Sequence, residues 1–595
     1  MPLDTPPDDV LPPPGLLDAL AHHEAGRSAA AEAGYHAVLA ADPAQPQALY
    51  LCGMLALQTA RPAEAAPLLA RAAQARPGHA ESRFALGNAL WQVRDKPAAI
   101  DAWQAALELE PAHLGATLNL AKARADSGDY GATVALCHKA THIAPNDPSA
   151  HAALGAALLG GSQPVAALRA ADTALGLAPN LAEAHFLRGT ALKQLGRTAE
   201  AAAALARAAA LSPRHAQALL NLGNTELLLG DPAAAERHCR AALAADPAMA
   251  EAHASLGCLL TNAGRLPEAI LACHAAIALK PDLAEAHWNL GIAQLLGGDL
   301  PGGFAEYEWR KRHPAHQKDF RRLPQPEWQG EDLAGRTLLV LAEQGLGDAI
   351  MFARFLAPLA QRGARVLLAC DRRVLPLLAA APGVARAVPR DRALPDCDFW
   401  VDQMSLPHRL GTTLASIPSA AGYLNADPAR VAAWEARLPK RREGARRIGL
   451  VWAGNPLHSN DARRSCPAAA LRPLVAMAGD DFVSLQLGSE AAEARALGLA
   501  DQSAALTDFA ETAALLAGLD LVVTVDTAVA HAAGALGRPT WLMLPHAPDW
   551  RWLLGRADSP WYAGARLFRQ ARPGDWDAVV AAIAQSLATE PPALY

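Results

Sequence analysis

A fixed spacing of 34 residues runs through the first half of this 595-residue chain. A small residue recurs at each step, at Gly53, Gly87, Ala121, Gly155, Gly189, Gly223, Gly257 and Gly291. Prolines keep the same step, at Pro43, Pro77, Pro111, Pro145, Pro179, Pro213, Pro247 and Pro281. Proline ends a helix because it lacks an amide hydrogen and clashes with the preceding turn. The spacing therefore predicts a row of two-helix units, each closed by its proline.

This pattern resembles the tetratricopeptide repeat, a helix-turn-helix unit that buries its apolar face only against its neighbours. Extended to its limits it gives about nine repeats over residues 12–317, an α-solenoid. The resemblance implies a long concave groove that binds a partner. Repeated asparagines such as Asn88 and Asn119 are candidates to bind an extended peptide, or else to pack between helices. Histidines and cysteines that recur at fixed repeat positions, such as His185 and Cys239, indicate structural residues, and we expect no metal site there.

Composition narrows the class of protein. Hydrophobic residues make up 52% of the chain, charged residues 19%, and the net charge is −6, which excludes a wholly disordered chain and gives no support for nucleic-acid binding. Residues 1–11 are acidic and proline-rich, so we expect a disordered tail without an export signal. No stretch is typical of a transmembrane segment. The eight cysteines form no C-x-x-C pair, which favours reduced thiols and a cytoplasmic location.

After a predicted linker at 318–335 the periodicity changes. Short apolar runs now alternate with glycine-containing turns and helical spacing, a pattern typical of parallel sheets covered by helices. The alternation stops and restarts, which predicts two Rossmann-like halves at 336–436 and 448–589 with a basic joint at 437–447. The basic run at 310–312, just before the linker, is expected to be a solvated face.

Ligands of such halves bind beyond the carboxyl ends of the strands. Asp526 and Thr527 directly follow the predicted strand 519–525 and precede a predicted helix. Its free amide groups and positive dipole end would suit a phosphate, and Asp526 is expected to cap it. His531, one turn into that helix, is positioned to donate to a diphosphate oxygen.

The segment from Val525 to Pro539 (VDTAVAHAAGALGRP) resembles the donor-site segment of heptosyltransferase-like glycosyltransferases, and Gly345-Leu-Gly347-Asp348 resembles their N-terminal turn. Together with the repeats, the chain resembles bacterial tetratricopeptide-repeat glycosyltransferases. The resemblance implies a GT-B fold in which the first half faces the acceptor and the second the nucleotide sugar. One departure is Ala528, because the related motif has glycine at that position.

The resemblance implies an inverting transfer in which Asp348 takes the proton of the acceptor hydroxyl. The alternative is that Asp348 only caps a helix. Arg463 or Arg464 is expected to meet the diphosphate charge, while Gln486 and Thr527 are expected near the nucleotide. No metal and no cofactor besides the nucleotide-sugar co-substrate is implied. Tryptophans and a tyrosine at 550–562 either stack on a ligand or pack a loop. The second possible function is a scaffold whose transferase half is inactive.

Overall fold

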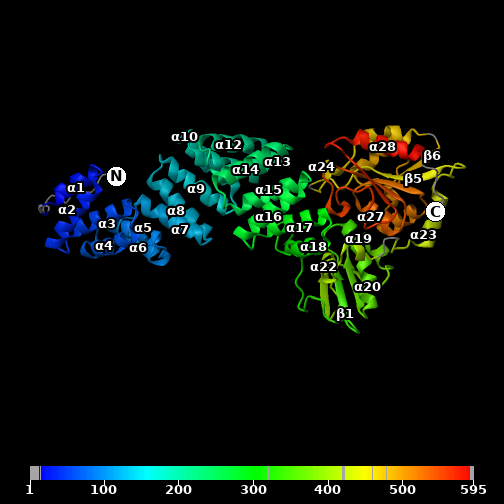
Figure 1. Cartoon of the computed structure of the whole chain (residues 1–595), viewed down its shortest axis with the longest axis horizontal. Coiled ribbons are helices and arrows are strands. Elements are labelled where there is room, and N and C mark those ends of the chain that lie inside the picture. Colours follow the sequence, from blue (N-terminus) through cyan, green and yellow to red (C-terminus); the bar gives the residue numbers. More distant parts are fainter. Residues whose placement is uncertain are drawn as a thin grey trace. The chain divides into compact units, whose positions relative to one another are not determined.

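The computed structural model describes residues 13, 15–317, 320–418, 422–458, 460–477 and 479–589, so the expected tail at 1–11 lies outside the described residues. The chain divides into two compact units, Met1–Pro247 and Ala248–Tyr595 (Figure 1). The division falls inside the repeat array. The last repeats therefore belong to the same unit as the α/β region.

The first unit consists of consecutive helices joined by short turns (Figure 1). They are α1 (Leu16–Glu24), α2 (Ser28–Ala41), α3 (Pro46–Gln58), α4 (Pro62–Ala75), α5 (Ala80–Gln92), α6 (Lys96–Leu109), α7 (Leu114–Asp126), α8 (Tyr130–Ile143), α9 (Pro148–Gly160), α10 (Pro164–Leu177), α11 (Ala182–Gln194), α12 (Thr198–Leu211), α13 (Ala216–Leu228) and α14 (Pro232–Ala245). Even-numbered helices end two residues before the periodic proline, as α4 does before Pro77. The predicted helical solenoid is confirmed.

The small residue of each repeat lies where the two helices of that repeat touch. A Cβ atom added to Gly53 would lie 2.7 Å from Cγ of Leu69, and one added to Gly223 would lie 2.9 Å from the carbonyl oxygen of Ala235. Contacts this close exclude a larger side chain unless the helices separate. In these two repeats the glycine thus sets the distance between the paired helices, whereas a Cβ atom on Gly155 would come no closer than 3.6 Å to its neighbours.

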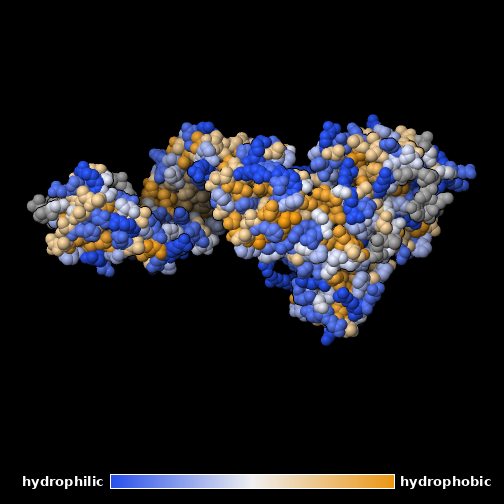
Figure 2. Space-filling view, viewed as in Figure 1, coloured by the Kyte–Doolittle hydropathy of each residue, from blue (hydrophilic) through white to orange (hydrophobic). Residues whose placement is uncertain are grey.

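The second unit begins with the final helices of the array. These are α15 (Ala250–Asn262), α16 (Leu266–Leu279), α17 (Ala284–Gly297) and α18 (Leu300–Tyr307), followed by a 3-10 helix, η1 (Glu308–Lys311). Figure 2 shows hydrophobic side chains on the visible face over α16, where Leu271 is 70% exposed. The basic run after α18 differs from the expected solvated face, because Arg310 is fully buried.

The first sheet of this unit contains four parallel strands in the order β3-β2-β1-β4. They are β1 (Thr337–Leu341), β2 (Arg365–Cys370), β3 (Val384–Pro389) and β4 (Phe399–Asp402). The associated helices are α19 (Leu346–Phe352), α20 (Leu356–Gln361), α21 (Leu375–Leu378) and α22 (Leu406–Arg409). Helix α23 (Pro428–Arg437) comes next along the chain but packs against the second half, where its Glu435 pairs with Arg447 at 2.9 Å. Residues 320–335, expected within a linker, pack on this sheet: Trp328 is fully buried and its amide donates to the carbonyl of Trp400 at 2.7 Å.

The second sheet contains five parallel strands in the order β6-β5-β7-β8-β9. They are β5 (Arg446–Val451), β6 (Asp480–Ser484), β7 (Leu521–Val525), β8 (Thr540–Leu544) and β9 (Ala565–Arg569). The α-helices among them are α24 (Asp461–Arg464), α25 (Arg472–Val475), α26 (Phe509–Ala517), α27 (Ala528–Ala535) and α28 (Trp576–Thr589). Strand β9 was not predicted. The parallel α/β character of both parts agrees with the alternating sequence pattern.

In both sheets, the side on which the chain adds new strands changes at a central strand. The chain leaves β1 for β2 on one side and later adds β4 on the other, and it leaves β5 for β6 before adding β7 on the opposite side. In open parallel sheets such a reversal separates the loops that follow the two strands and creates the usual ligand position. The turn at 343–348 follows β1, and the segment 526–531 follows β7. Both predicted motifs therefore stand at the reversal points.

One hydrophobic core extends from the last repeat into both sheets' helices. The Phe304 ring of α18 lies edge-on to Phe352 of α19 at 6.3 Å and to Trp550, beyond β8, at 5.6 Å between centroids. Helix α18 is therefore an integral part of the α/β region. None of the helices in the described part of the chain combines the length and hydrophobicity needed to cross a bilayer.

Candidate functional site

The two turns predicted to form the site lie directly against each other. A Cβ atom on Gly347 would stand 2.7 Å from Cδ2 of His531 and 3.3 Å from Cα of Ala528. Helices α19 and α27 can approach this closely only because residue 347 has no side chain. The structure therefore brings the Gly345–Asp348 turn and the start of α27 together.

Asp348 is the third residue of α19, and its carboxylate takes part in a capping box at the start of that helix, as the capping alternative expected. The N-cap is Gly345, whose amide donates to Oδ2 of Asp348 at 2.9 Å. The other carboxylate oxygen, Oδ1, accepts a hydrogen bond from Nη2 of Arg551. The side chain remains 15% exposed. One oxygen thus orders the turn, while the other is held by a cation from the second half.

Sequence reasoning missed Arg551. Its Nη1 donates to Oδ1 of Asp549 at 2.7 Å, and its guanidinium lies 4.4 Å from the centre of the Trp550 ring. The residue is 8% exposed, and the carboxylates of Asp348 and Asp549 raise its pKa well above the ordinary arginine value. A signal was present, since an arginine between Trp550 and Trp552 in a chain with few aromatics indicates a buried, partnered cation.

Asp526 does not cap α27 as expected. The N-cap is Thr527, and α27 begins at Ala528. Burial and the nearby charge of Asp549 raise the pKa of Asp526 to about 6, although Arg551 and Arg464 act in the opposite direction. A carboxyl group in such surroundings exchanges its proton near neutral pH.

His531 is buried beside these acids. Its Nδ1 lies 2.9 Å from the hydroxyl oxygen of Tyr562, its Nε2 lies 4.0 Å from Oδ1 of Asp526, and its ring stacks on Trp552 with centroids 5.4 Å apart. Burial and the positive charge of Arg551 hold the pKa of His531 well below 6.5. The imidazole is therefore neutral at physiological pH, with one N–H available as a donor.

The other candidates are placed unequally. The charge of Arg464 acts on Asp526, and its side chain pairs with Asp461 at 3.1 Å. Arg463 is exposed, and its charge acts on Cys258 of α15. Thr527 shares a 3.3 Å hydrogen bond with Thr524.

Gln486 differs from the expected ligand contact, because its amide is occupied by the backbone. Its Oε1 accepts from the amides of Trp452 and Ala453, each at 3.0 Å, and its Nε2 donates to the carbonyls of Ala453 and Leu487 at 3.0 and 2.9 Å. It orders the loop after β5. The aromatic residues at 550–562 also have packing roles, since Trp550, Trp552 and Trp561 are each at most 2% exposed.

The last repeat supports the turn after β1. The Tyr307 hydroxyl lies 3.1 Å from Oε1 of Gln344, a residue with a left-handed backbone (φ 62°) that only glycine adopts without strain. Arg310 Nη2 donates to Oε1 of Glu343 and to Oγ of Ser405, both at 2.8 Å. Burial raises the pKa of Glu343 against the opposing charge of Arg310. None of these contacts was foreseen.

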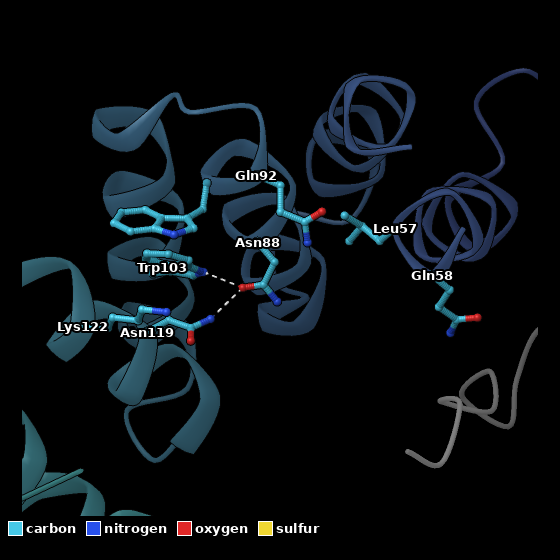
Figure 3. A pocket seen from close by; sticks show the side chains of 8 residues that line it. Leu57, Gln58, Asn88, Gln92, Trp103, Asn119 and Lys122 are labelled. Atoms are coloured by element: carbon cyan, nitrogen blue, oxygen red, sulfur yellow. Dashed lines mark hydrogen bonds between the residues drawn. The ribbon is translucent and has the colours of Figure 1, made fainter. Parts of the chain in front are cut away.

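In the first unit, the repeated asparagines connect neighbouring repeats. Asn119 Nδ2 donates to Oδ1 of Asn88 at 2.7 Å, and the same oxygen accepts from the indole of Trp103 at 3.1 Å (Figure 3). These amides line a cavity of about 420 Å³ together with Gln92 and Lys122 (Figure 3). Packing between helices is therefore one established role of these asparagines, and the cavity leaves room for a ligand beside them.

The periodic histidines also have structural partners. His151, His185 and His287 each place Nε2 2.8–3.0 Å from the carbonyl oxygen of the proline six residues earlier. The periodic cysteines Cys137 and Cys239 are buried. Within the described ranges, no group of three or more potential ligands is arranged to hold a metal ion.

Two protein families match parts of the chain. The tetratricopeptide repeat family matches six segments: 16–80, 84–148, 152–216, 186–250, 220–284 and 254–314. Glycosyltransferase family 9 (heptosyltransferase) matches residues 483–541. The latter segment contains Asp526 and His531 but does not reach Asp348.

Individual proteins match less of the chain. Protein FlbA of Caulobacter vibrioides is 32% identical over 322 residues, 49% of this chain and 53% of that protein, so the chain spans about half the length of this curated relative. The solved structure of YrrB, described as a TPR protein with an unusual peptide-binding site, shares 24% identity over 30% of this chain and 92% of its own, with a TM-score of 0.26. A thermophilic TPR protein of Thermus thermophilus, TTC0263, shares 25% identity over 31% of this chain and 99% of its own, with a TM-score of 0.28. The chain thus carries tetratricopeptide repeats through residue 314 and, in its C-terminal region, a segment that matches glycosyltransferase family 9 (heptosyltransferase).

Proposed function

We propose that the C-terminal region is a glycosyltransferase of the GT-B type, built from the halves around the two sheets. The observation that carries this proposal is the contact between the turn containing Asp348 and the start of α27, each at the reversal point of its own sheet. The family 9 match to residues 483–541, which contains the α27 segment, supports the same assignment.

In the proposed reaction a nucleotide sugar binds at α27 and transfers its sugar with inversion. The Asp348 carboxylate takes the acceptor hydroxyl proton as that oxygen attacks the anomeric carbon, and the nucleoside diphosphate leaves. The neutral His531, the Thr527 hydroxyl and the start of α27 would meet the leaving diphosphate. Arg464 is better placed than Arg463 to add positive charge, and Gln486 acts through the loop it orders.

We further propose that the repeats recruit a protein or glycan acceptor, in the cytoplasm and without nucleic acid. The polar cavity lined by Asn88, Asn119 and Lys122 supports a peptide ligand, because it offers amide and ammonium groups on one surface (Figure 3). The alternative, a scaffold with an inactive transferase region, is favoured by one observation: Asp348 is bound to Arg551.

A single experiment separates the two functions. The full chain is incubated with a panel of nucleotide sugars while free nucleotide and thermal stabilisation are recorded. A transferase is expected to be stabilised by one donor and to release nucleotide from it, and Asp348→Asn should still bind that donor without turnover. Binding without release in the presence of candidate acceptor peptides, or no binding by the folded protein, would favour the scaffold.

A further inference from the structure

Arg551 is held by two carboxylates from different parts of the unit. Asp348 comes from the turn after β1, and Asp549 comes from the loop after β8. The guanidinium still has unused capacity, because its buried Nε has no hydrogen-bond partner among the described residues. A nine-tenths buried cation with a free donor is a position for a further anionic acceptor.

The surroundings of Arg551 belong to the proposed donor site. Its charge acts on Asp526 and His531, which flank the start of α27, and on Tyr307 of the last repeat. The side chains of Asp348 and Asp549 are 15% and 35% exposed, so both acids that hold the guanidinium can be reached from solvent. The side chain of Arg551 is itself only 9% exposed, so an anion would reach the guanidinium by displacing one of these acids.

We propose that Arg551 binds the diphosphate of the donor and that, in doing so, it exchanges its hydrogen bond to Asp348 for one to the diphosphate. This inference rests on the proposed transferase function. A guanidinium binds carboxylate and phosphate oxygens through the same planar fork, so one anion can replace the other. When the diphosphate takes Arg551, the Oδ1 atom of Asp348 becomes free to accept the acceptor proton. Asp549 keeps the arginine in place during the exchange.

This exchange predicts opposite effects on nucleoside-diphosphate affinity when Arg551 and when Asp348 is substituted. Removing the cation with Arg551→Gln should weaken binding of a nucleoside diphosphate by at least about 30-fold, and Arg551→Lys should weaken it less. Removing the competing acid with Asp348→Asn should instead tighten binding by about three- to tenfold, because Arg551 is then available at all times. The double variant should lose that gain.

The test is calorimetric titration of the full chain with ADP, GDP, UDP and CDP in turn. Arg556→Gln is the matched control, since Arg556 lies on the same loop but pairs with the exposed Asp558 at 2.6 Å. Unfolding temperatures establish that each variant is folded. If the wild type binds a diphosphate and folded Arg551→Gln binds it equally well, or if Asp348→Asn fails to tighten binding, Arg551 has only a structural role. If the wild type binds none of the four, the proposed function fails together with this inference.

Discussion

The two units differ in what they bury. In the described residues of the first unit, the buried polar side chains are a histidine, a serine and three threonines. The part of the second unit that the structure describes buries seven ionisable side chains of arginine, aspartate or glutamate: Arg310, Glu343, Arg354, Asp402, Arg447, Asp480 and Arg551. Each repeat gains stability by packing small and apolar side chains against its neighbours at equivalent positions. The α/β unit accepts the costly desolvation of charges, and some of these charges join segments that are distant in sequence, as Arg310 joins Glu343.

The strongest way to sharpen this comparison is to remove one buried charge. Arg310→Met leaves Glu343 buried without its cation, so we expect unfolding free energy to fall by about 3–5 kcal/mol. The control is Arg188→Met in the first unit, where the pair with Asp172 is largely exposed and the change should stay below about 1 kcal/mol. Urea unfolding of the full chain measures both. Equal effects would show that burial of the charges does not distinguish the units.

The next largest effect concerns Asp526, because burial of its carboxylate should lower the free energy of unfolding at neutral pH. Raising its pKa from 3.8 to about 6 costs the folded state about 3 kcal/mol at neutral pH. The folded protein retains the proton between those two values, so stability falls as pH rises through that window and the full cost applies above pH 6.

Asp526→Asn should therefore stabilise the protein, by more at pH 8 than at pH 5. Thermal unfolding at the two pH values provides the measurement. A variant that is less stable than wild type at pH 8 would show that the pairing with Arg551 and Arg464 outweighs burial.

One glycine from each unit, Gly223 and Gly347, provides a test with a smaller expected effect on stability. Gly223→Ala places a Cβ 2.9 Å from a backbone oxygen in one repeat, and we expect a loss of about 1–3 kcal/mol in stability with no effect on turnover. Gly347→Ala meets His531 and Ala528, so it should displace Asp348 from α27 and reduce turnover by at least about 30-fold at a similar cost in stability. If the two substitutions reduced turnover equally, contact between the turns would not be what positions the site.

The two units also differ in how far the sequence predicts them. The 34-residue spacing predicts the helices of the array because every repeat meets the same neighbour. Buried apolar runs likewise indicate strands such as β1 and β7. Strand β9 was missed because Ala-Arg-Leu-Phe-Arg carries charge at a sheet edge and lacks the continuous apolar run of a central strand.

The candidate site was predictable only in part. Asp526 and His531 are marked by their position just beyond a predicted strand, whereas Asp348 is singled out by the resemblance of its turn to that of heptosyltransferase-like glycosyltransferases. Arg551 and Asp348 are separated by 203 residues in the sequence, and Arg310 and Glu343 by 33 residues. Such pairings depend on how the two sheets and the last repeat pack, and no local pattern encodes them. The same holds for Arg463 and Arg464, which are adjacent in sequence but differ in exposure.

The smallest expected effect separates structural from binding roles in the array. Asn119→Ala removes one hydrogen bond to Asn88, which should cost about 1 kcal/mol, because Asn88 keeps its bond from Trp103. Asn221→Ala is the matched change at the same repeat position away from the cavity lining, since Asn221 donates to Thr190 at 3.3 Å. If the cavity takes a peptide, only Asn119→Ala should also weaken acceptor binding, measured by titration with the acceptor that mass spectrometry identifies after co-expression. Equal weakening by both variants would mean that the asparagines act through the shape of the array, and no weakening by either would remove the cavity from acceptor recognition.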